Sequence, residues 1–285
     1  MVFNGTKFQV IRYGHDKDIK DDTNYFTEDT NEIIEKFESL IDLGVILSDD
    51  ATFDKHVENV VKKVRQKTGW VLRTFYSRRQ DIMKTLFKSL VLPHVDYCSQ
   101  LWMPSKTSQI EIIEKLQKDF FSRIPAIREF NYWDQLKCMK MLSLQRRHER
   151  YRIIYTWKVL EGLVPDCGVK KKQEGGRSGR KCEIPPINRK ARKSIQTLRE
   201  QTFQVNGPQL YNILPANVRN MTRCSIDEFK MKLDKFLEGI PDEPSVRGLT
   251  PGACTAEARA SNSLLDQVRR VQMANTHMAT FQIGG

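Results

Sequence analysis

The sequence lacks any long apolar run, and no stretch of 18 consecutive apolar residues occurs in its 285 residues. A membrane-spanning helix needs about 20 such residues, so membrane insertion is not expected. No apolar segment follows Met1, so a secretory signal is not expected either, and the predicted location is intracellular, cytoplasmic or nuclear. The six cysteines form no CxxC pair. We therefore expect reduced thiols, with neither a metal site nor a cofactor.

What the sequence has in excess is positive charge, with a formal net charge of +12. Residues 1–50 carry 5 basic and 12 acidic side chains, 51–169 carry 22 and 12, 170–199 carry 11 and 2, and 200–285 carry 9 and 9. A contiguous basic excess is typical of proteins that bind a polyanion such as nucleic acid. The alternative is a solvated helical surface that is merely rich in Lys.

Residues 1–50 indicate a small β region. Apolar and polar residues alternate over 7–14, which predicts a strand. Residues 37–47 predict a second strand, in which Gly44 marks a bulge or a close backbone approach. Two strands do not make a domain, so this segment is expected to be the edge of a sheet whose other strands are absent.

From residue 51 to 169 the apolar spacing is that of helices. Valines and other apolar residues recur every three or four positions from Val57 to Phe75, which predicts a long amphipathic helix. The next helix is expected to stop at Pro93, and a Ser108–Glu111 capping box is expected to open another. The chain is therefore predicted to be mainly α, as a multi-helix array with a small β edge.

The remaining third of the chain divides by composition. Residues 170–199 combine Gly, Pro, Lys and Arg without an apolar period, which predicts a basic flexible loop. A small helical region is expected over 200–240. Residues 241–285 are small and polar, and a disordered tail is predicted there.

Six segments of the chain, in order, resemble the post-catalytic part of the reverse transcriptases of jockey-like LINE, or non-LTR, retrotransposons. They cover nearly the whole chain. The segments are "LGVILSDDATFDKHVENVVKKVRQKTGWVLRTF", "LFKSLVLPHVDYCSQLWMPSK", "IEKLQKDFFSRI", "LSLQRRHERYRIIYTWKVLEGLVP", "NGPQLYNILPANVRN" and "GIPDEPSVRGLTPGACTAEARASNSLLDQ".

The resemblance implies a remnant of the polymerase palm over 1–50 and a thumb-like domain over 51–169. In this family the metal-binding palm aspartates precede a segment similar to "FNGTKF", so the chain is expected to begin after them. It is then not itself an enzyme, and Mg²⁺ belongs only to the intact polymerase. Lys7 matches a palm lysine that assists the leaving pyrophosphate. Leu43, Gly44 and Val45 resemble the primer grip, which holds the primer 3′ end.

The adjacent acids Asp49 and Asp50 raise the alternative of a metal-dependent polymerase or nuclease that would also use acids of the 16–35 loop. Two-metal catalysis needs several converging carboxylates. Successive side chains of a strand point to opposite faces, so one adjacent pair cannot provide them. A structural turn before the helix is therefore expected.

The expected partner is RNA or DNA, as a template–primer duplex bound through its backbone. His56, His94 and His148 lack partners at metal or nucleophile spacing and are expected to be structural. A helical protein-interaction module without a nucleic-acid role is the alternative function. The candidate phosphate-binding residues are Lys62, Lys63, Arg65, Lys67, Arg73, Arg78, Arg79, Arg146, Arg147, Arg150, Lys170, Lys171, Lys172, Arg177, Arg180 and Lys181.

Overall fold

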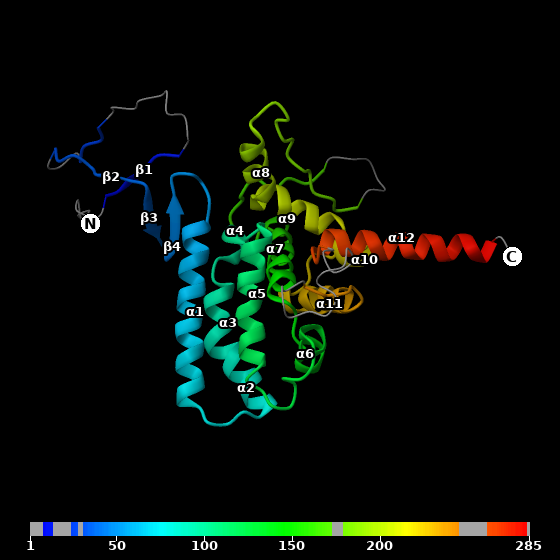
Figure 1. Ribbon diagram of the computed structural model, residues 1–285. Coiled ribbons are helices and arrows are strands. Elements are labelled where there is room, and N and C mark those ends of the chain that lie inside the picture. Colours follow the sequence, from blue (N-terminus) through cyan, green and yellow to red (C-terminus); the bar gives the residue numbers. More distant parts are fainter. Residues whose placement is uncertain (1–7, 14–23, 28–30, 173–178, 245–260, 284–285) are drawn as a thin grey trace. The chain divides into compact units, whose positions relative to one another are not determined.

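The computed structural model describes residues 8–13, 24–27, 31–172, 179–244 and 261–283. The protein is mainly helical, with small two-stranded sheets near its N-terminus (Figure 1), which confirms the predicted fold class at this level. The chain divides into two compact units, residues 1–62 and 63–285. The division falls inside the first helix, whereas the sequence placed a boundary at residue 50.

The first unit contains two pairs of short strands. Strand β1 (Val10–Ile11) is parallel to β2 (Lys36–Phe37), and β3 (Ser39–Asp42) is antiparallel to β4 (Val45–Ser48). The predicted strand over 7–14 is therefore much shorter than its alternating pattern indicated.

The prediction of a single strand over 37–47 is wrong, because the chain reverses direction at Leu43 and Gly44. Both residues have positive φ, 45° and 84°, and Asp42 pairs with Val45 across them. A two-residue hairpin turn of type I′ requires positive φ at both central positions, and glycine adopts it without steric cost. Gly44 thus marks the turn of a hairpin, not a bulge within a strand.

Helix α1 (Asp54–Thr74) begins in the first unit and continues into the second. The predicted valine stripe is confirmed, since five valines at helical spacing are 6% exposed or less: Val57, Val60, Val61, Val64 and Val71.

The expectation that the next helix stops at Pro93 is wrong. Helix α2 (Gln80–Leu86) continues through one π turn, η2 (Phe87–Val91), into α3 (Leu92–Asp96). The amide of Leu92 donates to the carbonyl of Phe87, a wider loop than an α turn. Pro93 follows this wider turn directly, and the local change in hydrogen bonding lets the helix continue past a residue that has no amide hydrogen.

Four helices follow: α4 (Ser99–Trp102), α5 (Thr107–Phe121), α6 (Tyr132–Met139) and α7 (Leu144–Leu160). The N-cap of α5 is Lys106 and no side chain caps it, so the predicted Ser108–Glu111 capping box is wrong.

Helices α6 and α7 begin at side-chain caps. The Asn131 side chain accepts from the amide of Asp134, and Ser143 Oγ accepts from the amide of Arg146. Helix α7 packs against α4, α5 and α9 and is central to the second unit (Figure 1).

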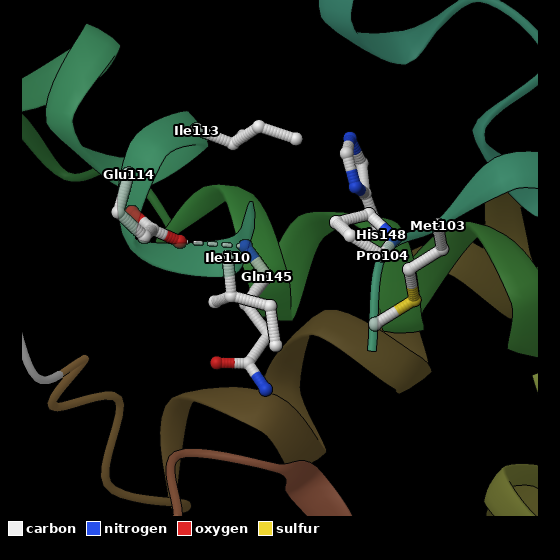
Figure 2. A pocket seen from close by; sticks show the side chains of 7 residues that line it. All are labelled: Met103, Pro104, Ile110, Ile113, Glu114, Gln145 and His148. Atoms are coloured by element: carbon white, nitrogen blue, oxygen red, sulfur yellow. Dashed lines mark hydrogen bonds between the residues drawn. The ribbon is translucent and has the colours of Figure 1, made fainter. Parts of the chain in front are cut away.

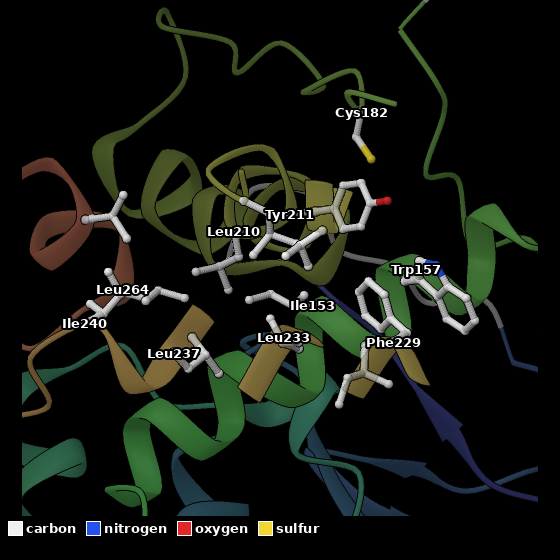
Figure 3. Packing of buried hydrophobic residues seen from close by; sticks show 14 of the residues in the cluster. Ile153, Trp157, Cys182, Leu210, Tyr211, Phe229, Leu233, Leu237, Ile240 and Leu264 are labelled. Carbon is white, nitrogen blue, oxygen red and sulfur yellow. The ribbon is translucent and has the colours of Figure 1, made fainter. Parts of the chain in front are cut away.

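The C-terminal part contains α8 (Lys193–Gln201), α9 (Phe203–Asn212), α10 (Ala216–Arg219), α11 (Ile226–Glu238) and α12 (Leu264–Ile283). Buried side chains from α7, α9, α11 and α12 form one apolar cluster (Figure 3). At one end of this cluster the rings of Trp157 and Phe229 are stacked, with centroids 4.6 Å apart.

Two predictions for the C-terminal part need correction. The loop predicted over 170–199 ends at Lys193, where α8 begins. The disordered tail predicted over 241–285 contains α12, whose Leu264 and Val268 are buried in the cluster. These two apolar side chains are four residues apart, so they share the helix face that packs against the core.

Candidate nucleic-acid interface

Helix α1 presents a basic surface. From Lys62 to Thr74 it contains five cationic residues and no acidic one. All but Lys67 are exposed. In the parts of the chain that the structure describes, no carboxylate lies within ion-pair distance of any of the five. We call this set the α1 basic face: Lys62, Lys63, Arg65, Lys67 and Arg73.

His94 of α3 extends this surface. Burial is the main cause that lowers the pKa of His94, and the positive charges of Lys67 and Lys63 lower it further. The imidazole therefore lies in the positive field of α1. Sequence reasoning set His94 aside as structural, because it lies 27 residues beyond Lys67 and only the packing of α3 beside α1 brings them together.

An exposed aromatic ring lies within the same surface. Trp70 is 43% exposed, and the Lys67 ammonium lies over its ring, 4.9 Å from the centroid. The Arg73 guanidinium folds back along the helix over Gly69, where a Cβ atom would lie 3.1 Å from Arg73 Nη1. Lys67 and Arg73 thus lie three residues before and three residues after Trp70 on the helix.

Arg78 and Arg79 are engaged locally. The Arg78 guanidinium donates to the backbone carbonyls of Phe75 and Leu72, the latter at 2.7 Å, and so satisfies the C-terminal end of α1. Arg79 pairs with Asp81 at 3.0 Å on the surface. Their positive charge is therefore less available to a ligand than that of the α1 basic face.

The three candidate arginines of α7 serve the fold. Arg146 is fully buried, donates to the carbonyl of Pro241 at 2.9 Å and lies 3.5 Å from the Glu149 carboxylate. Arg146 was predicted to contact a phosphate, and in this structure its side chain has no exposed surface.

The other two candidates on α7, Arg147 and Arg150, each form a two-pronged ion pair with a carboxylate of another helix. Arg147 holds Asp96 with contacts of 2.8 to 3.0 Å, and Arg150 holds Asp234 with an Nη2–Oδ2 distance of 2.8 Å. Such two-pronged pairs are strong and directional, so these arginines join α3 and α11 to α7.

The basic segment after residue 169 is divided between surface and core. Lys170, Lys171, Lys172 and Lys181 are exposed on a short antiparallel bridge between Lys171 and Cys182, whereas Arg177 lies outside the described residues. Arg180 is only 8% exposed and pairs with Glu161. Its guanidinium also donates to two backbone carbonyls, so Arg180, predicted to contact a phosphate, is engaged within the fold.

The candidates of the first unit are placed as follows. Lys7 lies outside the described residues. Leu43 is 83% exposed and Gly44 is beside it on the hairpin turn, whereas Val45 is buried. Leu43 and Gly44 therefore form the tight turn itself, and Val45 is the first residue of β4.

The adjacent acids Asp49 and Asp50 precede α1. Asp50 Oδ1 accepts from the amide of Thr52 at 2.8 Å and from its hydroxyl at 2.9 Å. A side chain that bonds the amide two residues on forms an Asx turn, the structural role expected for this site. Among the described residues no three His, Cys, Asp or Glu side chains lie close enough to hold a metal ion.

A small pocket lies in the second unit, lined by Met103, Pro104, Ile110, Ile113, Glu114, Gln145 and His148 (Figure 2). His148 Nε2 lies 3.1 Å from the Val95 carbonyl, and burial lowers the pKa of His148 to about 4, so the ring is neutral. The pocket has room for little more than a water molecule and is not a ligand site. No described helix has the length and apolar character needed to span a membrane.

Comparison of the chain with family models, curated proteins and solved structures finds no match. The resemblance to reverse transcriptases therefore depends on the residues of this sequence alone.

Proposed function

We propose that this chain is a non-catalytic nucleic-acid-binding fragment, related to the post-catalytic part of a non-LTR retrotransposon reverse transcriptase. In this proposal α1 and the helices after it act as a thumb that holds template–primer duplex by its backbone, and the small strands of the first unit are the remnant of a palm. The observation that carries the proposal is the α1 basic face, with five cations and no acidic partner among the described residues.

The physical reason lies in the difference between paired and unpaired cations. A lysine that already neutralises a carboxylate gains little from a phosphate. An unpaired lysine on a helix surface releases condensed counterions from the nucleic acid when it binds. Burial is the main cause of the lowered pKa of His94, and the charges of Lys67 and Lys63 lower it further. That second effect supports this reasoning, because it means that a further positive charge is disfavoured there. A phosphate would relieve the same repulsion.

The test is fluorescence anisotropy of a labelled RNA–DNA hybrid, titrated with the protein between about 50 and 200 mM salt. If the five cations each meet a phosphate, the logarithm of affinity falls against the logarithm of salt with a slope of about −4 to −5. Replacement of Lys63 and Lys67 by Gln should reduce the magnitude of that slope by about 2.

A matched control removes the same charge elsewhere. Lys232 and Lys235 of α11 are also exposed. Their replacement by Gln lowers the net charge equally and should leave both affinity and slope close to those of the unchanged protein. Equal losses in the two double variants would mean that only the overall charge matters, and the α1 basic face would not be the binding site. Salt-independent, weak binding by the unchanged protein would favour the protein-interaction alternative.

A further inference from the structure

Trp70 differs from the other tryptophans of the second unit in its exposure. Its side chain is 43% exposed, whereas Trp102 is 1% exposed and Trp157 is fully buried in the cluster of Figure 3. Trp133 is half-buried and donates its indole N–H to the Pro244 carbonyl. The buried valine stripe of α1 passes through Val71, its neighbour, so the fold does not need an aromatic ring at position 70. A single exposed apolar ring is common on protein surfaces, so a role for Trp70 has to be inferred from what surrounds it.

The surroundings of the ring are cationic and aromatic. Lys67 lies over Trp70, 4.9 Å from its centroid, and the Phe75 ring meets it edge-on at 6.1 Å with an interplanar angle of 87°. Arg73 lies one turn further along, held close to the helix because Gly69 has no side chain. Cations thus precede and follow the ring along the helix, and in the described residues neither is paired with a carboxylate.

This combination matches the chemistry of an unpaired nucleotide. Every base has a π face that stacks on an aromatic ring whatever its sequence, and the phosphates on either side of the base need cations. Paired bases inside a duplex offer no free face, because their neighbours already cover them. A peptide partner would be drawn to an apolar ring as well, but five unpaired cations on one helix favour a polyanion.

We propose that Trp70 is a stacking platform for an unpaired base of single-stranded nucleic acid, with Lys67 and Arg73 contacting the phosphates beside that base. The ring edge and face left open by Lys67 receive the base. This inference rests on the proposed function and adds to it a site for single strands, such as the unpaired template beyond a primer end.

The experiment compares the affinities of the full chain for a single-stranded oligonucleotide and for a duplex of the same length at one low salt concentration. Trp70→Ala should weaken single-strand binding about 5- to 150-fold, the range for loss of one base–aromatic stack. Duplex binding should change less than about twofold, because the phosphate contacts are kept. Trp70→Phe should retain most of the single-strand affinity, since a smaller ring still stacks.

The control is Phe130→Ala, which removes an aromatic ring of similar exposure, 46%, beside the paired Arg128 and Glu129. Its single-strand affinity should stay unchanged. A second measurement does not depend on Trp70→Ala. Binding of a single strand should quench the tryptophan fluorescence of the unchanged protein and of Phe130→Ala, and it should quench that of Trp70→Phe far less.

The outcomes separate the inference from the function that it rests on. Equal single-strand affinities for Trp70→Ala and the unchanged protein would overturn the stacking site, while salt-dependent duplex binding would leave the proposed function standing. If the unchanged protein binds neither form at low salt, the proposed function fails first and the stacking site fails with it.

Discussion

Ionisation of Glu114 should lower the stability of the helical unit as pH rises. Glu114 lies on α5 and is fully buried. One carboxylate oxygen accepts from the amide of Gln145 at 2.7 Å, and the other accepts from the Tyr132 hydroxyl at 2.7 Å. No described cation pairs with it, so burial dominates and raises its pKa from 4.5 to about 7.

The sign and size follow from proton linkage. Between pH 4.5 and about 7 the unfolded chain has released this proton while the folded chain still holds it, so the free energy of unfolding falls as pH rises. Below pH 4.5 the stabilisation is fully present, and above about 7 no more is lost. Each tenfold difference in acidity corresponds to about 1.4 kcal/mol, so Glu114 accounts for a loss of roughly 3 kcal/mol.

Glu114→Gln isolates this contribution. The amide oxygen can still accept from Gln145 and the amide nitrogen can still face the Tyr132 hydroxyl, so the fold should persist. Urea unfolding of both proteins at pH 5 and pH 8 gives the comparison. The unchanged protein should lose roughly 3 kcal/mol more than Glu114→Gln over this interval. Burial also raises the pKa of Glu149 to about 7. Glu149 is present in both proteins, so its contribution to the pH dependence cancels in the comparison.

Parallel losses in the two proteins would refute the reasoning. That result would mean that Glu114 ionises in the folded protein at its ordinary pKa. Water would then have to reach the carboxylate between α5 and α7, contrary to its burial.

Two further predictions concern single side chains. Leu264→Ala should lower the free energy of unfolding by about 2–5 kcal/mol, because it opens a cavity in the cluster. Met273→Ala on the same helix, where Met273 is 64% exposed, should be nearly neutral in the same urea titration. Gly69→Ala should raise stability by about 0.5–1 kcal/mol, because the new Cβ meets only the flexible end of Arg73 and the helix propensity improves. A lower thermal midpoint for this variant would show that Arg73 cannot move aside.

The sequence predicted what depends on local periodicity. The valine stripe of α1 has the period of a helix, and the structure buries it as expected. The hairpin at residues 39–48 was not predicted, because apolar residues continue through its turn. Only the positive φ of Leu43 and Gly44 distinguishes two strands from one. The helix end predicted at Pro93 was wrong for a related reason, since a π turn just before Pro93 lets the helix continue.

Long-range polar contacts explain why the ordered C-terminal segment was missed. Asn262 donates to Asp242 at 2.9 Å, and Asp242 in turn accepts from the hydroxyl of Ser143 at 2.6 Å. The amide of Leu264 donates to the Glu149 carboxylate at 3.1 Å. These partners are 20 to 115 residues apart in the sequence. The polar residues that precede α12 show no apolar period, so their order comes from partners that only the fold brings to them.

The division of basic residues between core and surface follows the chemistry of the two cations. Arginine carries a planar fork that can hold a carboxylate with two parallel bonds and still reach backbone carbonyls, and it is the cation suited to burial. Arg147 of α7 holds Asp96 with two-pronged contacts, and Arg180, beside Cys182, pairs with Glu161 and donates to two backbone carbonyls. Lysine is a strongly hydrated point charge, and on α1 it stays at the surface. A count of net charge treats both alike and therefore overestimates the surface offered to nucleic acid. The α1 basic face is a part of the chain's positive charge that no described carboxylate neutralises, which is why the binding tests begin at Lys63 and Lys67.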